Sequence, residues 1–175
     1  MPKKGKNAKK KASKGESKTS KAVAKPEVKK SLPKKYEAMF QQILKLYESK
    51  KYDKGMKLCK SLLKHHPTHG QTLSMKGLLT YNIDSANTEV AFDLCKKGLA
   101  LDMKSHVTWH VYGILYRAVD NQRMAIKCYN NALKLDPENQ NILRELANLQ
   151  GQMRDWNGYS ESRRKLLTAR PKDTQ

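Results

Sequence analysis

The sequence has little from which a covalent framework or a metal site could be built. Its three cysteines, Cys59, Cys95 and Cys128, are odd in number and form no CxxC pair, which argues against both a disulfide framework and a zinc site. We expect reduced thiols, with Cys59 and Cys95 as small core residues rather than reactive groups. The sequence therefore predicts no metal site and no bound cofactor.

Long apolar segments are also missing. No run of about 18 apolar residues occurs that could cross a membrane, and no apolar stretch follows the basic first residues, as a secretory signal would require. The chain has no glycine-rich phosphate loop, no nucleophile elbow and no carboxylate pair with catalytic spacing. We expect a soluble, non-catalytic protein of the cytoplasm, with the nucleus as the alternative, and neither a membrane partner nor a small-molecule substrate.

Negative charge is scarce in residues 1–35, where fourteen lysines stand against Glu16 and Glu27. The net charge of this segment is +12, out of a formal +20 for the whole chain. Besides Met1, its only sizeable apolar side chains are Val23, Val28 and Leu32, too few for their burial to offset the entropy lost on ordering the segment. We predict that residues 1–35 form a disordered basic tail.

The tail suggests a polyanionic partner. A membrane surface is the weaker candidate, because the tail lacks an apolar face with which to enter the lipid interface. Three interpretations remain open: a solubilising tail, a nuclear import signal, or an arm that binds RNA phosphates by counterion release and without base specificity. The candidate RNA-binding lysines of the tail are Lys3, Lys4, Lys6, Lys9, Lys10, Lys11, Lys14 and Lys18.

From Tyr36 onward, apolar residues recur at spacings of three and four, which predicts an all-helical fold. The breaks at Met103, Pro137 and Pro171 are 34 residues apart, and a period of 34 is that of tetratricopeptide repeats. We therefore predict a superhelix of about four helical hairpins in residues 36–173. Its four units are residues 36–69, 70–105, 106–139 and 140–173.

The third unit fits the tetratricopeptide signature at each position. Small residues let the two helices of a hairpin approach closely, large rings fill the adjoining gaps, and Pro137 ends the second helix because proline cannot continue its hydrogen bonds. In the second unit, two additional residues fall in an expected turn at 82–87. The predicted packing residues are Gly77, Ala91, Cys95 and Gly98 of unit two, and Trp109, Tyr112, Gly113, Tyr116, Ala125, Tyr129, Ala132 and Pro137 of unit three.

The second helices of the hairpins carry a row of mostly basic residues. The packing position of the second helix is Cys59, Cys95 and Tyr129 in units one to three. The residue directly after this position is Lys60, Lys96, Asn130 and Arg164 in units one to four. These residues should line up when the units stack. They would then form either a basic stripe for an anionic partner, with Lys60, Lys96 and Arg164 as further candidate RNA contacts, or an ordinary solvated face.

Five histidines are the remaining candidates for a metal site. His106 and His110 lie four residues apart on an expected helix, but no glutamate follows His106 in the HExxH manner and no third ligand has a characteristic spacing. His65, His66 and His69 lie near the junction of units one and two. We predict structural or surface roles for all five.

Several unbroken strings are not required by repeat packing, namely residues 69–77, 104–113, 125–134 and 142–159. With these strings, residues 33–171 resemble the amino-terminal repeats of the large auxiliary subunit of the N-terminal acetyltransferase A (NatA) complex. The string KSHVTWHVYG at 104–113 is the most specific. The resemblance implies a non-catalytic scaffold on the ribosome, which positions a catalytic subunit that acetylates amino termini exposed after methionine removal.

The resemblance therefore implies the ribosome, with its RNA, and a catalytic acetyltransferase subunit as partners. The later repeats of the family wrap the catalytic subunit and, with it, hold an inositol polyphosphate; no position of this chain matches them. The chain ends four residues after Pro171 without a capping helix, so we expect a fragment, a short form, or an end face that docks elsewhere. The alternative is a generic tetratricopeptide adaptor with a basic RNA-binding or nuclear-import tail.

Overall fold

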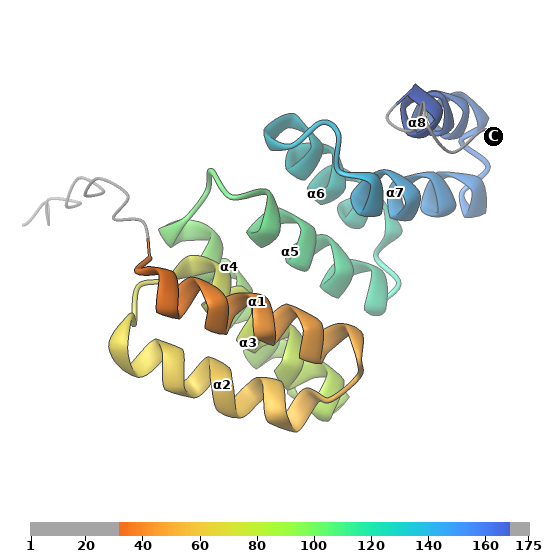
Figure 1. Ribbon diagram of the computed structural model, residues 1–175. Coiled ribbons are helices and arrows are strands. Elements are labelled where there is room, and N and C mark those ends of the chain that lie inside the picture. Colours follow the sequence, from red (N-terminus) through yellow and green to blue (C-terminus); the bar gives the residue numbers. More distant parts are fainter. Residues whose placement is uncertain (1–31, 169–175) are drawn as a thin grey trace, which may run out of the picture.

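Four helical hairpins follow one another in the computed structural model, which describes residues 32–168 (Figure 1). Figure 1 shows them running from α1 and α2 at the lower left to α7 and α8 at the upper right. We call the first helix of each unit its A helix and the second its B helix. The elements are α1 (Lys34–Glu48), α2 (Tyr52–His65), α3 (Gly70–Ile83), the short 3-10 helix η1 (Ser85–Asn87), α4 (Thr88–Leu101), α5 (His106–Ala118), α6 (Gln122–Leu135), α7 (Gln140–Gln152) and α8 (Trp156–Thr168).

The predicted all-α array of about four hairpins is confirmed. No strand occurs between residues 32 and 168, and none of the helices in this range is both long and apolar enough to span a lipid bilayer. The candidate lysines from Lys3 to Lys18 lie outside the described residues, as does Pro171.

The first helix begins two residues earlier than the expected boundary at Tyr36. Lys34 and Lys35, which the sequence places in the tail, are the first two residues of α1. Pro33 precedes them, and its carbonyl oxygen accepts hydrogen bonds from the backbone N–H groups of Tyr36 at 2.8 Å and Glu37 at 3.1 Å. Proline suits a helix start because its ring fixes φ and its missing N–H is not needed there.

The A and B helices of units one, three and four are joined by the same tight turn. It is centred on a residue in the left-handed region, with φ near 57° at Lys50 and 58° at Asp120 and Arg154. In unit one the next N–H, that of Lys51, donates to the carbonyl of Leu46 at 2.9 Å, which is the six-to-one hydrogen bond of a Schellman motif. These turns set the antiparallel course of each hairpin.

The turn of unit two is built differently. Sequence alone places it at 82–87, whereas α3 continues to Ile83 and the turn begins at Asp84. The Asp84 carboxylate accepts hydrogen bonds from the N–H of Ala86 at 3.0 Å and from the side chain of Asn87 at 2.8 Å. Because these bonds stabilise η1, the two additional residues of the unit are absorbed without disturbing α4.

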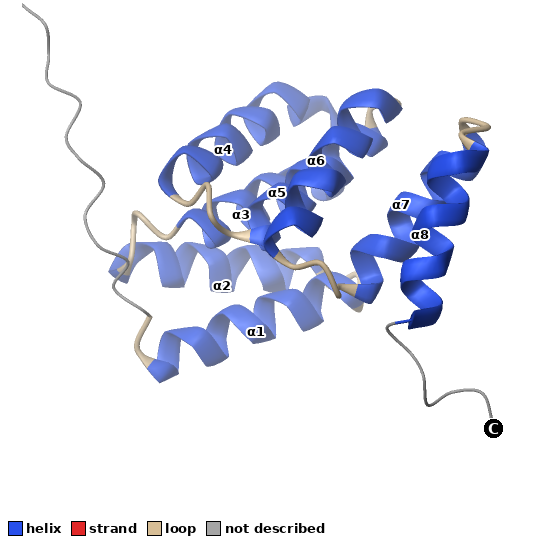
Figure 2. Ribbon diagram, turned by 90° about the horizontal axis from the view of Figure 1, so that it is seen from above, coloured by secondary structure: helices blue, strands red, loops and turns tan. Residues whose placement is uncertain are grey.

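The buried side chains form two clusters along the array. The first contains Phe40, Ile43 and Leu79 and fills the space among units one to three, and the second contains Tyr129 and Ile142 and joins units three and four. Trp109, Ile114 and Tyr116 of α5 pack against both clusters. Seen from above in Figure 2, α7 and α8 lie side by side at the end of the array away from α2. Each hairpin therefore contributes to a shared core, as stacked repeats require.

Candidate functional site

The residues that the sequence assigns to repeat packing lie between helices. In unit two, Gly77, Ala91, Cys95 and Gly98 are buried. Those of unit three fall into three classes by exposure. Tyr112, Gly113, Ala125, Tyr129 and Ala132 are buried, Trp109 and Tyr116 are half-buried, and Pro137 is exposed two residues after the end of α6.

The three cysteines are buried and chemically protected. Burial raises the pKa of the thiols of Cys59, Cys95 and Cys128 to about 12. Because the thiolate is the nucleophile, such thiols are poor reactive groups at neutral pH. Cys128 is adjacent to the packing residue Tyr129 and lies on another face of the same helix, and it also belongs to the first core cluster.

The histidines make polar or ring contacts within the fold. His69 Nδ1 caps α3 by accepting the N–H of Thr72 at 3.4 Å, while the rings of His65 and His66 lie 5.5 and 4.5 Å from that of Tyr36. His106 lies 3.8 Å from the Asp136 carboxylate. Among residues 32–168, no group of three or more histidine, cysteine or acidic residues could hold a metal ion.

Sequence reasoning missed a polar cluster that joins units three and four around the Glu145 carboxylate. Glu145 Oε2 accepts a hydrogen bond from the Tyr129 hydroxyl at 2.8 Å, and it lies 3.3 Å from Arg117 Nη1 and 3.5 Å from His110 Nε2. Burial raises the pKa of Glu145, but hydrogen bonds and charge from His110, Tyr129 and Arg117 outweigh burial, and the pKa is lowered. The carboxylate is thus held ionised.

The charge of this cluster also acts on a tyrosine of unit one. Burial, followed by the charges of Tyr52 and Glu145, raises the pKa of Tyr47 in α1 to about 12. Arg117 is the cation that the A helix of unit three would offer to an incoming carboxylate, and it already lies beside Glu145. The arrangement therefore fits a structural connection between units better than a clamp for a peptide carboxylate.

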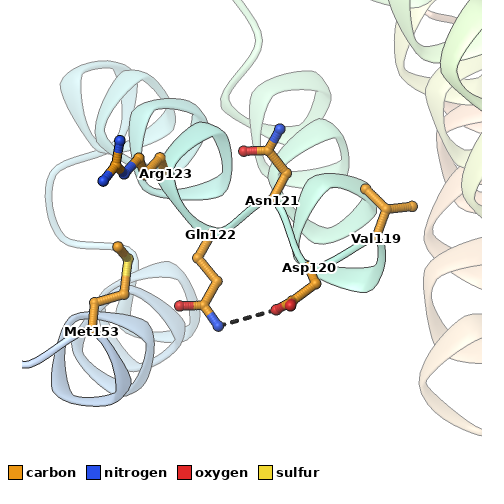
Figure 3. Close-up of a pocket in the computed structure, with 6 residues that line it drawn as sticks. All are labelled: Val119, Asp120, Asn121, Gln122, Arg123 and Met153. Atoms are coloured by element: carbon orange, nitrogen blue, oxygen red, sulfur yellow. Dashed lines mark hydrogen bonds between the residues drawn. The ribbon is translucent and has the colours of Figure 1, made fainter.

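An open hollow lies between the α5–α6 turn and the end of α7 (Figure 3). Figure 3 shows the Gln122 side chain turned toward Asp120, to which Gln122 Nε2 donates at 3.2 Å. A corresponding hollow in unit one lies between the α1–α2 turn and the end of α3. The lining of the first hollow is Val119, Asp120, Asn121, Gln122, Arg123 and Met153. Asp120 and Arg123 are the charged residues of this lining, and their arrangement does not indicate a catalytic site.

The predicted row on the B helices is exposed to solvent. Lys60 of α2, Lys96 of α4 and Arg164 of α8 are all exposed, as is Asn130 of α6. The row does not stand in uniformly basic surroundings. Asp93 is exposed one turn before Lys96, and Glu161, one turn before Arg164, forms an ion pair with Lys165 at 2.7 Å. Positive charge is therefore unevenly distributed along the B helices.

The repeated turns, the small residues at the helix contacts and the shared core define a tetratricopeptide-repeat array. Residues 37–174 match the family described as Psidin, N-terminal TPR repeats region. The chain belongs to this family.

The relatives described next are auxiliary subunits of NatA, and they confirm the resemblance inferred from residues 33–171. The chain is 52% identical over 141 residues to the N-terminal acetyltransferase A complex auxiliary subunit NAA15 of Arabidopsis thaliana, a match that covers 81% of this chain and 16% of that protein. It is 51% identical over 142 residues to the human N-alpha-acetyltransferase 16, NatA auxiliary subunit, with 80% and 16% covered. The chain thus spans only about a sixth of the length of these relatives.

A solved structure of a relative has the same fold. The structure of Naa15/Naa10 bound to HypK-THB contains a chain that is 49% identical and superposes with a TM-score of 0.71. The match covers 78% of this chain and 20% of that chain. The region compared is therefore the tetratricopeptide array alone.

Proposed function

We propose that this chain is a non-catalytic auxiliary part of the NatA complex, which acts in co-translational N-terminal acetylation by docking on the ribosome in the cytoplasm. The observation that carries the proposal is the identity to NatA auxiliary subunits, which is 52% over 141 residues and 51% over 142 residues. Those relatives are named as auxiliary subunits, which supports a role as scaffold rather than as catalyst.

Ribosome docking is supported by the charge of the chain. Eight lysines between Lys3 and Lys18 precede the array, and the exposed faces of α2, α6 and α8 carry further lysines and arginines. Ribosomal RNA presents a dense row of phosphates, and lysines that neutralise them gain free energy by releasing counterions. The ribosome is therefore the polyanionic partner that we propose.

A catalytic acetyltransferase subunit is the second proposed partner. The relative of known structure was solved with Naa10, and this chain corresponds to a fifth of that Naa15 chain. Co-purification of the tagged chain, followed by washes of rising salt and mass spectrometry, tests this partner. Recovery of a catalytic subunit at a salt concentration that removes ribosomes would support direct assembly, and ribosomes without that subunit would argue against it.

The tail is tested by pelleting the full chain with purified ribosomes across a salt series. Replacing the eight lysines from Lys3 to Lys18 with glutamine should abolish most pelleting at physiological salt, because each phosphate contact contributes roughly 0.7 to 0.9 to the slope of log affinity against log salt. The matched control replaces the same eight residues with arginine and should pellet like the unsubstituted chain. Equal pelleting of the glutamine variant would show that the tail is not an RNA arm, and no pelleting of any form would refute ribosome docking.

A further inference from the structure

The N-caps of the A helices differ in chemistry from unit to unit. His69 precedes α3, Ser105 precedes α5 and Asn139 precedes α7. His69 and Asn139 each accept a hydrogen bond from the backbone N–H three residues later, that of Thr72 at 3.4 Å and that of Ile142 at 3.2 Å. Serine and asparagine are among the preferred N-cap residues, and histidine is not. A titratable ring therefore makes in unit two the hydrogen bond that an amide makes in unit four.

The His69 cap requires a ring nitrogen that carries no proton. His69 Nδ1 accepts the N–H of Thr72 and lies 2.6 Å from the hydroxyl oxygen of the same residue. Nδ1 can accept only in the neutral tautomer that carries its proton on Nε2. Protonation of Nδ1 would turn the acceptor into a donor that faces another donor, and the N-terminus of a helix also repels positive charge. The neutral ring therefore caps α3, and the charged ring cannot.

The cap lies where units one and two meet. The His69 ring is 5.5 Å from the ring of Phe40 in α1 and nearly perpendicular to it, at 84°. Phe40 and Thr72 are both buried. The first turn of α3 is also packed tightly against the end of α4, since a Cβ added at Gly70 would lie 2.9 Å from the Cβ of Asp102. The capped turn thus contacts unit one on one side and α4 on the other.

Charged and titratable groups from three elements act on His69. Burial lowers the pKa of His69 below its ordinary value of 6.5 and outweighs the charges of Glu37 in α1 and Asp102 at the end of α4, which raise it. His66, at the end of α2, lowers the pKa further. Because the folded pKa is lowered, the contribution of the neutral ring to stability is present above pH 6.5 and is lost as the pH falls through the folded value.

We infer that His69 is a pH switch for the joint between units one and two. With a neutral ring, it caps α3 and holds the first turn of that helix against α1 and α4. When Nδ1 takes up one proton from solvent, the ring releases Thr72 and turns toward the carboxylates of Glu37 and Asp102. The first turn of α3 then opens, and unit one is held less firmly on the rest of the array. This switch does not depend on the proposed function.

The test is residue-resolved amide hydrogen exchange of the full chain, measured by NMR at neutral and mildly acidic pH and corrected for the intrinsic exchange rate. Protection of the Thr72 amide should fall roughly fivefold on acidification, the size expected for the loss of one N-cap. The Ile142 amide, capped by Asn139, is the control in the same molecule and should keep its protection. Constant protection of Thr72, or an equal fall at Ile142, would overturn the inference.

Two further signals are recorded on the same unsubstituted sample. The amides of α1 should lose protection together with Thr72, because the cap joins α3 to unit one through Phe40. A change confined to Thr72 would show a local cap without an effect on the joint, and would overturn the switch. The ring protons of His69 should titrate below pH 6.5, and titration at or above that value would also contradict it. None of these measurements requires a substituted chain.

A pair of variants then assigns the pH dependence to His69. His69→Asn replaces the ring with the amide that caps α7, so protection of Thr72 should no longer depend on pH. His69→Ala removes the cap, so protection should be low at both pH values. Circular dichroism at neutral pH checks that each variant is folded. A fall in Thr72 protection in His69→Asn as large as in the unsubstituted chain would assign the effect to another group, such as His66, and would overturn the inference.

Discussion

Units one and three share the same repeat but place their distinctive residues on opposite sides of the B helix. In unit three the packing position of α6 is the fully buried Tyr129, and in unit one the same position of α2 is the small Cys59. On the outer face, α2 has four lysines where α6 has two. Inner and outer positions of one helix thus vary independently.

The comparison indicates that units one and three have different roles in the array. Tyr129 contacts the second core cluster and donates to Glu145 of α7, so it connects unit three to unit four. The Cys59 side chain has no hydroxyl group that could donate to a neighbouring unit as Tyr129 does. The charged side chains on the outer face of α2 are exposed to solvent. Unit three is therefore suited to hold the array together, and unit one is suited to present a surface.

The largest expected effect is the loss of the Tyr129 ring. Tyr129→Ala should lower the free energy of unfolding by about 3 to 5 kcal/mol, because it leaves a large cavity at a fully buried position. The equivalent change in unit one, Cys59→Ala, removes a single heavy atom and should cost roughly 1 kcal/mol. Urea unfolding followed by far-ultraviolet circular dichroism measures both, and equal losses would show that the two units contribute alike.

Much of this fold follows from the sequence. Small residues and rings at fixed positions, such as Ala125 and Tyr129, define the period, because only certain volumes fit where two helices touch. Pro137 marks the end of a B helix, since its ring cannot continue the hydrogen bonds. The core and the order of the hairpins could therefore be inferred from spacing alone.

The remaining features depend on tertiary contacts or on unusual turn residues. Lys50, Asp120 and Arg154 occupy left-handed positions that normally favour glycine, so the usual signal of the turn was missing. The cluster around Glu145 brings together residues as far apart in sequence as His110 and Glu145, and no local pattern reports such a contact.

A smaller effect is expected from the Glu145 carboxylate, which has no equivalent in unit one. Since the pKa of Glu145 is lowered in the folded state, its contribution is present above the ordinary carboxyl pKa of 4.5 and is lost as the pH falls through the lower folded value. Glu145→Gln should cost about 1 to 2 kcal/mol at pH 7, since it weakens hydrogen bonds to a charged group. The stability curves of the two proteins should converge under acidic conditions.

The matched control is Glu161→Gln in α8. Glu161 also has a lowered pKa, caused by its hydrogen bond to Lys165 and the charge of that residue, but it is fully exposed. Exposed ion pairs contribute little to stability, so this variant should unfold like the unsubstituted chain at every pH. If both variants changed the pH dependence equally, the carboxylate cluster could not be the link between units three and four.

The smallest expected effect is a gain in unit one. Gly55 of α2 stands where the other packed B helices have Ala91 and Ala125, and an added Cβ would lie 3.3 and 3.4 Å from the two terminal methyl groups of Leu79. These methyl groups can shift slightly, so Gly55→Ala should raise the free energy of unfolding by about 0.5 to 1 kcal/mol through helix propensity.

In unit three, replacing a glycine with alanine is expected to have the opposite effect on stability. A Cβ at Gly113 would lie 2.5 Å from the buried ring of Tyr129, so Gly113→Ala should lower the free energy of unfolding, because a filled site has no room for an added methyl group. Urea titration of both variants, with the sign of each change as the result, would show whether unit one has room that unit three lacks.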